Sequence, residues 1–293
     1  MTPIRTILAA TDLSVPSRHA AERAALIARD CAAALTLQHV VHTGALEMLR
    51  QLFAAAPADL HQRLLDEARE ELRAQAGELH LRFATAAELH LSAGAVVAEI
   101  AAQADALDAG LLVLGARGAS LVRDLTIGST TERVLRQTAR PLLVVRHAVH
   151  HGYRRVLLPV DFSPRSLRAI RMAMSLAPQA ELVLLHSFEV PFEGRLRHAG
   201  VGEDELALLR ARAQREAGEQ MAELVAAAGL EPDSVRSVLL HGEAGVHILD
   251  QEQLQGCELI AIGKRGQGPV EELLLGSVTR HVLTQARGDV LVI

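Results

Sequence analysis

Two glycine-rich segments carry the residue types and the spacing best suited to phosphate chemistry. The first reads Gly115-Ala116-Arg117-Gly118 and, after nine further residues, Gly128-Ser129. The second reads Gly263-Lys264-Arg265-Gly266 and, after nine residues, Gly276-Ser277. Glycines at the end of a strand let the backbone approach a ligand closely. A Gly-Ser pair that opens a helix presents free N–H groups at the positive end of the helix dipole. The spacing therefore predicts that each segment binds a phosphate chain.

An aspartate closes the first apolar run of each half of the chain. Asp12 follows Ile7-Leu8-Ala9-Ala10-Thr11, and Asp161 follows Val156-Leu157-Leu158-Pro159-Val160. Each is followed by an apolar residue and a serine. Carboxylate oxygens are the ligands that Mg²⁺ prefers in proteins. We therefore expect Asp12 and Asp161 to be the residues that contact any Mg²⁺ ion accompanying the phosphates.

The two glycine-rich segments belong to a longer internal repeat. Asp12 and Asp161 lie 149 positions apart, and Gly115 and Gly263 lie 148 apart. Such a nearly constant offset indicates a duplicated domain. We predict one domain over residues 1–147 and a second over 152–293. The segment between them, with His147, His150 and His151, is expected to be a solvated linker rather than a metal site.

The pattern of apolar residues predicts an α/β fold for each half. Most strand candidates are continuous Val, Ile and Leu runs, which is typical of parallel strands buried on both faces. Segments at helical spacing lie between them, for example Pro16–Ala33, Leu60–Gln75, Glu203–Ala228 and Ser277–Gln285. Alternating strands and helices indicate two tandem doubly wound domains. Ligands of such folds bind at the carboxyl ends of the strands, where the strand order reverses.

Composition excludes several classes of function. Aromatic residues make up 2% of the chain and there is no tryptophan, so stacking platforms for single-stranded nucleic acid are scarce. The net charge of -5 offers no broad basic field for a duplex. No apolar run is long enough to span a membrane. The two cysteines cannot form a disulfide framework, which fits a reducing compartment, and we expect a cytoplasmic protein.

Common catalytic and phosphate-binding motifs are absent from the sequence. The glycine segments match neither a Walker A loop nor the Gly-x-Gly-x-x-Gly dinucleotide fingerprint. There is no Gly-x-Ser-x-Gly nucleophile elbow. No general base is placed by a motif near the expected phosphates, so we assign no catalytic residue.

The Asp-apolar-Ser openings, the histidines that close the second strands (His39 and His186) and the two glycine segments resemble those of a tandem universal stress protein of the ATP-binding type. The resemblance covers both halves. It implies five-stranded parallel sheets of order 3-2-1-4-5, with ATP bound beside strands 1 and 4. It also implies a stress-response regulator whose halves pair through their last strands as a pseudo-dimer and associate further as a homodimer. The use of Arg in place of Lys, with Lys264 the one lysine, and the abundant Ala indicate a bacterial source.

The resemblance assigns roles residue by residue. Asp12 and Asp161 line the adenosine end of each pocket, and Val40 and Ser187 lie against the adenine. Ribose and phosphates are wrapped by Gly115, Gly118, Gly128 and Ser129 in the first half and by Gly263, Gly266, Gly276 and Ser277 in the second. Thr130 and Val278 add backbone donors, and Arg117, Lys264 and Arg265 are charge partners of the phosphates. Ser187 departs from the apolar residue usual at its position, which puts adenine packing in the second half in doubt.

Three functions follow from these expectations. The first is an ATP-binding regulatory protein that acts on a protein partner of unspecified identity. The second is a dimerising interaction scaffold that needs no nucleotide. The third is a slow ATPase or autophosphorylating enzyme.

Overall fold

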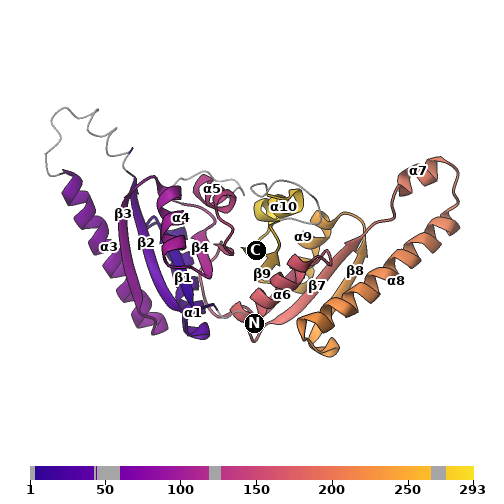
Figure 1. The fold of residues 1–293 in the computed structure, drawn as a ribbon, viewed down its shortest axis with the longest axis horizontal. Helices are drawn as coiled ribbons and strands as arrows, with labels where there is room; N and C mark the ends of the chain where they lie inside the picture. The colour runs from indigo at the N-terminus through magenta and orange to yellow at the C-terminus, as the bar shows by residue number, and fades with distance from the viewer. Residues whose placement is uncertain (1–3, 43, 45–59, 119–126, 265–274) are drawn as a thin grey trace. The chain divides into compact units, whose positions relative to one another are not determined.

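The computed structural model describes residues 4–42, 44, 60–118, 127–264 and 275–293. The chain divides into two compact units, Thr2–Gly152 and Tyr153–Ile293, and each is a three-layered α/β unit in its own right (Figure 1). Two of the predicted site residues, Arg265 and Gly266, lie outside the described residues.

The sheet of the first half has the strand order β3-β2-β1-β4-β5, with parallel pairing along it. Its strands are β1 (Thr6–Thr11), β2 (Ala34–His42), β3 (Ala87–Gly94), β4 (Leu111–Gly115) and β5 (Leu142–Val145). All five residues of β4 and all four of β5 are buried, as continuous apolar runs predict for strands covered on both faces. The predicted fold class and strand order are confirmed.

Helices cover both faces of this sheet. They are α1 (Val15–Cys31), α3 (Leu60–Phe83), α4 (Val96–Ala106) and α5 (Ser129–Gln137). Helix α1 packs with α3, which lies alongside β2 and β3 in Figure 1, and α4 packs with α5. Helix α3 continues beyond the predicted Gln75 because its buried stripe continues through Leu79 and Phe83.

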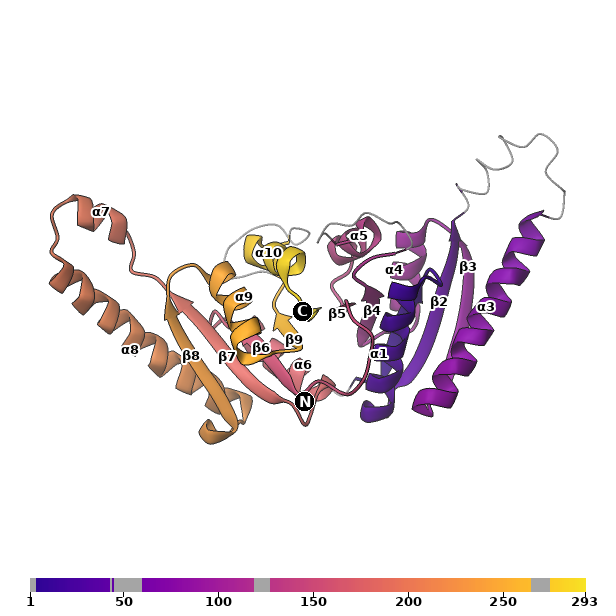
Figure 2. The same ribbon diagram turned by 180° about the vertical axis from the view of Figure 1, so that it is seen from behind.

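The second half repeats this arrangement with the order β8-β7-β6-β9-β10. Its strands are β6 (Arg155–Pro159), β7 (Glu181–Phe188), β8 (Val235–His241), β9 (Leu259–Ile262) and β10 (Asp289–Val292). Its helices are α6 (Pro164–Leu176), α7 (Glu193–His198), α8 (Glu203–Ala228), η1 (Pro232–Ser234), α9 (Ala244–Gln255) and α10 (Ser277–Gln285). The long helix α8 runs alongside β8 (Figure 2), and α9 packs with α10.

The segment before the second half is exposed at His147, His150 and His151, as predicted, but its backbone is held to the first half. Val149 is 1% exposed, and its carbonyl accepts a hydrogen bond from Arg82 Nη2 at 2.8 Å. The carbonyl of His151 accepts one from Arg23 Nη1 at 2.9 Å. Both arginines lie on helices of the first half, so this segment is anchored to the first unit.

Candidate functional site

The predicted site residues gather where the strand order reverses. In the first half β1 lies between β2 and β4, so Asp12, just after β1, lies beside the loop that follows β4. In the second half β6 lies between β7 and β9, which places Asp161 beside the loop after Ile262. The carboxyl ends of parallel strands, where the strand order reverses, are the usual ligand sites of doubly wound sheets.

Two glycines of the first half have close neighbours where a side chain would begin. A Cβ on Gly118 would lie 2.5 Å from Asp12 Oδ2. A Cβ on Gly115 would lie 2.9 Å from the carbonyl oxygen of Arg117 and 3.2 Å from that of Pro16. The contacts at Gly115 are with backbone atoms, so a side chain there would require the backbone to shift, whereas the contact at Gly118 is with the end of the Asp12 side chain.

Serines hold both aspartates in the same way. Asp12 Oδ1 accepts hydrogen bonds from the Ser14 backbone N–H at 3.1 Å and from Ser14 Oγ. Asp161 Oδ1 accepts them from the Ser163 backbone N–H at 3.1 Å and from Ser163 Oγ at 2.6 Å. These turns fix the direction in which each carboxylate points.

The residue after each aspartate has left-handed backbone geometry. The φ angle is 65° at Leu13 and 61° at Phe162, a conformation that side chains other than glycine seldom adopt. Repetition of the same costly conformation at the same position of both halves indicates that the surrounding structure enforces it.

The Asp161 carboxylate is stabilised in its charged form. Burial opposes ionisation, but hydrogen bonds from the hydroxyls of Ser163 and Ser166 outweigh it and hold the pKa of Asp161 below its usual value. The Ser166 hydroxyl lies 2.7 Å from Asp161 Oδ1. The site therefore carries a fixed negative charge near neutral pH, suited to ribose hydroxyls or to a cation.

A helix begins directly after each glycine segment, as predicted. Gly128 and Gly276 are the N-cap residues of α5 and α10, and neither helix has a side-chain hydrogen bond at its cap. The start of each helix carries the positive end of the helix dipole, which favours an anion.

A threonine fastens each of these helices to the strand before it. Thr131 Oγ1 donates to the carbonyl of Gly115 at 2.9 Å, and Thr279 Oγ1 donates to that of Gly263 at 2.8 Å. The sequence reasoning did not single out these threonines. Both segments continue as Gly-Ser-x-Thr, and this repeated threonine could have identified them from the sequence.

The second strands contribute matching histidines. His39 Nδ1 lies 2.8 Å from the carbonyl of Thr11, and His186 Nδ1 lies 2.8 Å from that of Val160. Each contact holds the end of the second strand against the residue that precedes the aspartate. Val40 and Ser187 follow, and within the described part of the chain the buried Ser187 Oγ has no hydrogen-bond partner.

The remaining predicted residues lie around the same loops. Ser129, Thr130 and Ser277 are exposed at the helix starts, whereas Arg117, Lys264 and Val278 are half-buried. Over the described ranges, no group of three or more His, Cys, Asp or Glu side chains is placed to hold a metal ion. In the same ranges no helix is both long enough and apolar enough to cross a bilayer.

Two doubly wound units, each with a serine-held aspartate at the switch point and a helix that begins after a glycine, define a tandem α/β protein. The profile of the Universal stress protein family matches residues 3–146 and 152–293. The chain belongs to this family.

Individual relatives agree with the family assignment. Universal stress protein MJ0531 of Methanocaldococcus jannaschii is 29% identical over 144 residues, which cover 48% of this chain and 82% of the relative. A universal stress protein structure from Archaeoglobus fulgidus aligns with a TM-score of 0.68 and 23% identity over 100% of this chain and 98% of its own. The structure of PA1789 from Pseudomonas aeruginosa, described as functionally unknown, aligns with a TM-score of 0.63 and 18% identity, covering 99% and 92%. These structures share the fold of both halves.

Proposed function

We propose that this protein is an ATP-binding stress-response regulator that holds one adenine nucleotide in each half. The observation that supports this function is the duplication of one constellation. In both halves a serine-held aspartate lies at the switch point, beside a helix whose first backbone donors have no side-chain cap.

The phosphates fit the glycine loops and the helix starts. Backbone N–H groups of Ser129 and Thr130 in the first half, and of Ser277 and Val278 in the second, are the proposed donors, with both serine hydroxyls beside them. The glycines named above let the loops wrap closely around the chain of phosphates. Arg117, Lys264 and Arg265 supply positive charge from the same loops.

The nucleoside fits the other end of each crevice. Asp12 and Asp161 are proposed to accept hydrogen bonds from ribose hydroxyls, and they are the oxygen ligands that a nucleotide-bound Mg²⁺ would meet. Val40 and Ser187, next to the strand-closing histidines, are proposed to lie against the base. A hydroxyl in place of an aliphatic side chain makes the second base pocket more polar than the first.

In this proposal ATP acts as a ligand that shifts the protein between states rather than as a substrate turned over rapidly. We propose a cytoplasmic protein that works through a protein partner and whose halves pair with each other. The nucleotide-free scaffold and the slow ATPase remain the alternatives, and the following experiment separates all three.

Freshly purified protein is denatured, and the released nucleotide is separated and quantified. We expect about two ATP molecules per chain. Added MgATP at about 1,000 times its Kd should stabilise each occupied site by about 4 kcal/mol. One nucleotide per chain would restrict the function to one half. ADP with slow phosphate release would favour the enzyme, and absence of both nucleotide and thermal shift would favour the scaffold.

A matched pair of variants assigns the binding to the proposed loop. Gly118→Val places a side chain against the Asp12 carboxylate, whereas Gly77→Val lies on α3, where a Cβ meets no atom within 4 Å. We expect Gly118→Val to lose the nucleotide of the first half while remaining folded by circular dichroism, and Gly77→Val to retain it. Equal ATP content in the two variants would refute the site.

A further inference from the structure

The two aspartates at the switch points differ in how far their carboxylates are open to a ligand. Asp12 is exposed, whereas Asp161 is half-buried and its Oδ2 atom is buried. Asp161 Oδ1 accepts hydrogen bonds from the Ser163 backbone N–H and from the hydroxyls of Ser163 and Ser166. These three donors occupy the lone pairs of Oδ1. A ligand can therefore meet the Asp161 carboxylate only after one of these donors is released.

A serine in the first turn of the following helix accounts for this difference. Ser166 Oγ lies 2.7 Å from Asp161 Oδ1 and accepts a hydrogen bond from the Asp161 backbone N–H at 3.0 Å. Ser17 is the equivalent residue of the first half and is buried to a similar degree. Its hydroxyl donates to the carbonyl of Ser14 at 3.0 Å. Because a hydroxyl has one hydrogen, Ser17 does not donate to Asp12.

The residue before each aspartate decides where this serine hydroxyl points. Thr11 Oγ1 lies 2.9 Å from Ser17 Oγ and accepts from the Leu13 backbone N–H at 3.0 Å. Since the Ser17 hydrogen points to the Ser14 carbonyl, the Thr11 hydroxyl is the donor of the Thr11–Ser17 pair. The second half has Val160 at this position. Valine has no hydroxyl, and the serine of that half donates to its aspartate.

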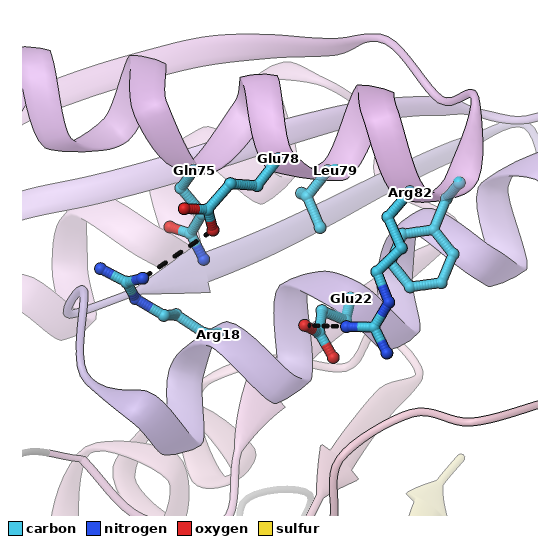
Figure 3. A pocket seen from close by; sticks show the side chains of 7 residues that line it. Arg18, Glu22, Gln75, Glu78, Leu79 and Arg82 are labelled. Carbon is cyan, nitrogen blue, oxygen red and sulfur yellow. Dashed lines mark hydrogen bonds and ion pairs between the residues drawn. The ribbon is translucent and has the colours of Figure 1, made fainter.

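Helix α1, which carries Ser17, is held in place by contacts of its own. Arg18 Nη1 lies 3.8 Å from Glu78 Oε2, and Arg82 Nη1 lies 2.5 Å from Glu22 Oε1. Both ion pairs join α1 to α3, as the dashed lines of Figure 3 show. Removal of the threonine hydroxyl that precedes the aspartate should therefore turn the Ser17 hydroxyl without moving the helix.

We propose that the residue before each aspartate makes the two nucleotide sites unequal, with the tighter site in the first half. This inference rests on the proposed function, in which the aspartates accept hydrogen bonds from ribose hydroxyls. Asp12 meets the ribose directly, whereas Asp161 must first give up the Ser166 hydroxyl. Loss of a hydrogen bond to a charged group shifts an equilibrium by about tenfold or more. ATP therefore binds the second half more weakly by that factor, and Ser166 is a positioning residue that acts through Asp161.

The test is calorimetric titration of the full-length protein with ATP. We expect two binding steps about tenfold apart, of which Gly118→Val removes the tighter. Ser166→Ala should tighten the weaker step about tenfold, whereas loss of a merely structural contact would not raise affinity. Val160→Thr should give the same gain while keeping Ser166. Ser175→Ala is the matched control, because it removes a hydroxyl that donates within the same helix, and it should change neither step.

The first half allows the reverse experiment. Thr11→Val should free the Ser17 hydroxyl to donate to Asp12 and weaken the tighter step about tenfold. Combining Thr11→Val with Ser17→Ala should restore this step, because no hydroxyl is then left to occupy the carboxylate. With 2′,3′-dideoxy-ATP, which lacks the ribose hydroxyls, these gains and losses should disappear.

The outcomes separate this inference from the proposed function. Two native sites of equal affinity would overturn the inference and leave nucleotide binding standing. So would a second site that fails to tighten in both Ser166→Ala and Val160→Thr, or changes of the same size with 2′,3′-dideoxy-ATP. Absence of any ATP binding by the native protein would overturn the proposed function and this inference with it.

Discussion

Asp161 illustrates how single residues set the chemistry of the switch point. Its carboxylate is partly buried, yet hydroxyl donors on Ser163 and Ser166 keep it ionised. Because its pKa is lower in the folded state than in the unfolded state, ionisation of Asp161 contributes stability above the unfolded pKa. That contribution disappears as the pH falls through the folded pKa.

The lowered pKa of Asp161 predicts how the stability of the protein changes with pH. Asp161→Asn should lower the Tm near pH 6, and the difference from the native protein should shrink as the pH falls toward about 2. Scanning calorimetry over that range checks it. Asp233→Asn, at an exposed position in η1, serves as the control and should leave the Tm nearly unchanged. A difference for Asp161→Asn that grows on acidification would contradict the assignment.

The cysteines are residues for which the structure predicts low reactivity. Burial raises the pKa of the Cys257 thiol to about 12. Burial, together with the neighbouring charge of Asp30, raises the pKa of Cys31 as well. The reactive thiolate form of Cys257 is therefore scarce near neutral pH.

We therefore expect slow labelling of the folded protein by a disulfide reagent, with Cys31, which is half-buried, reacting before the buried Cys257. The Cys31→Ala variant isolates the rate of Cys257, which should rise to that of a free thiol only when the protein is unfolded in denaturant. Rapid labelling of native Cys31→Ala would show that Cys257 is accessible.

At the scale of the elements, the helices that follow the glycine loops are held to the preceding strands by threonine hydrogen bonds. The buried Thr279 Oγ1 spans from α10 to the carbonyl that follows β9, and Thr131 does the same between α5 and β4. These bonds fix the helix starts relative to the strand ends, which is the geometry that a phosphate site needs.

Removing one such bond should be costly. Thr279→Val keeps the side-chain shape but leaves the Gly263 carbonyl without this donor, so the free energy of unfolding should fall by about 1–2 kcal/mol. Thr284→Val is the matched control, because it removes an exposed hydrogen bond of the same chemistry from the same helix. Urea denaturation of both variants measures the difference, and equal losses would show that the Thr279 bond is not special.

At the scale of the whole molecule, the second unit begins with a residue that is buried within that unit. Tyr153 is 6% exposed, and its hydroxyl donates to Asp289 Oδ2 at 2.6 Å, so the first residue of the second unit is joined to its last strand. Just before it, Val149 is buried against the first unit. The division between the units therefore falls within a few residues around Gly152.

Tyr153→Phe should destabilise the second unit without affecting the first. Loss of a hydrogen bond to a buried carboxylate should lower its free energy of unfolding by about 1.5–3 kcal/mol. Hydrogen exchange read separately over the two units checks this, since protection should fall in β10 and remain in β1. An equal loss of protection in both units would show that the Tyr153 hydrogen bond does not act within the second unit alone.

The sequence alone was sufficient for the fold, whereas the candidate site residues stay a prediction. Continuous apolar runs and a constant repeat offset depend only on local burial and on duplication, so the parallel sheets and the starts of α5 and α10 at Ser129 and Ser277 were predicted correctly. Asp12 and the segment after Gly115 each follow a predicted parallel strand. The sequence therefore also predicted that both lie at the carboxyl edge of the sheet.

Other features were decided only by the tertiary structure. Burial of Val149 depends on Arg82 and Arg23, which are distant in sequence and reach its segment only after the helices pack. The fastening by Thr131 and the left-handed turn at Leu13 likewise depend on neighbours from other elements. Periodicity reports which face of an element is buried, whereas a specific contact is set by the partner that packing places opposite it.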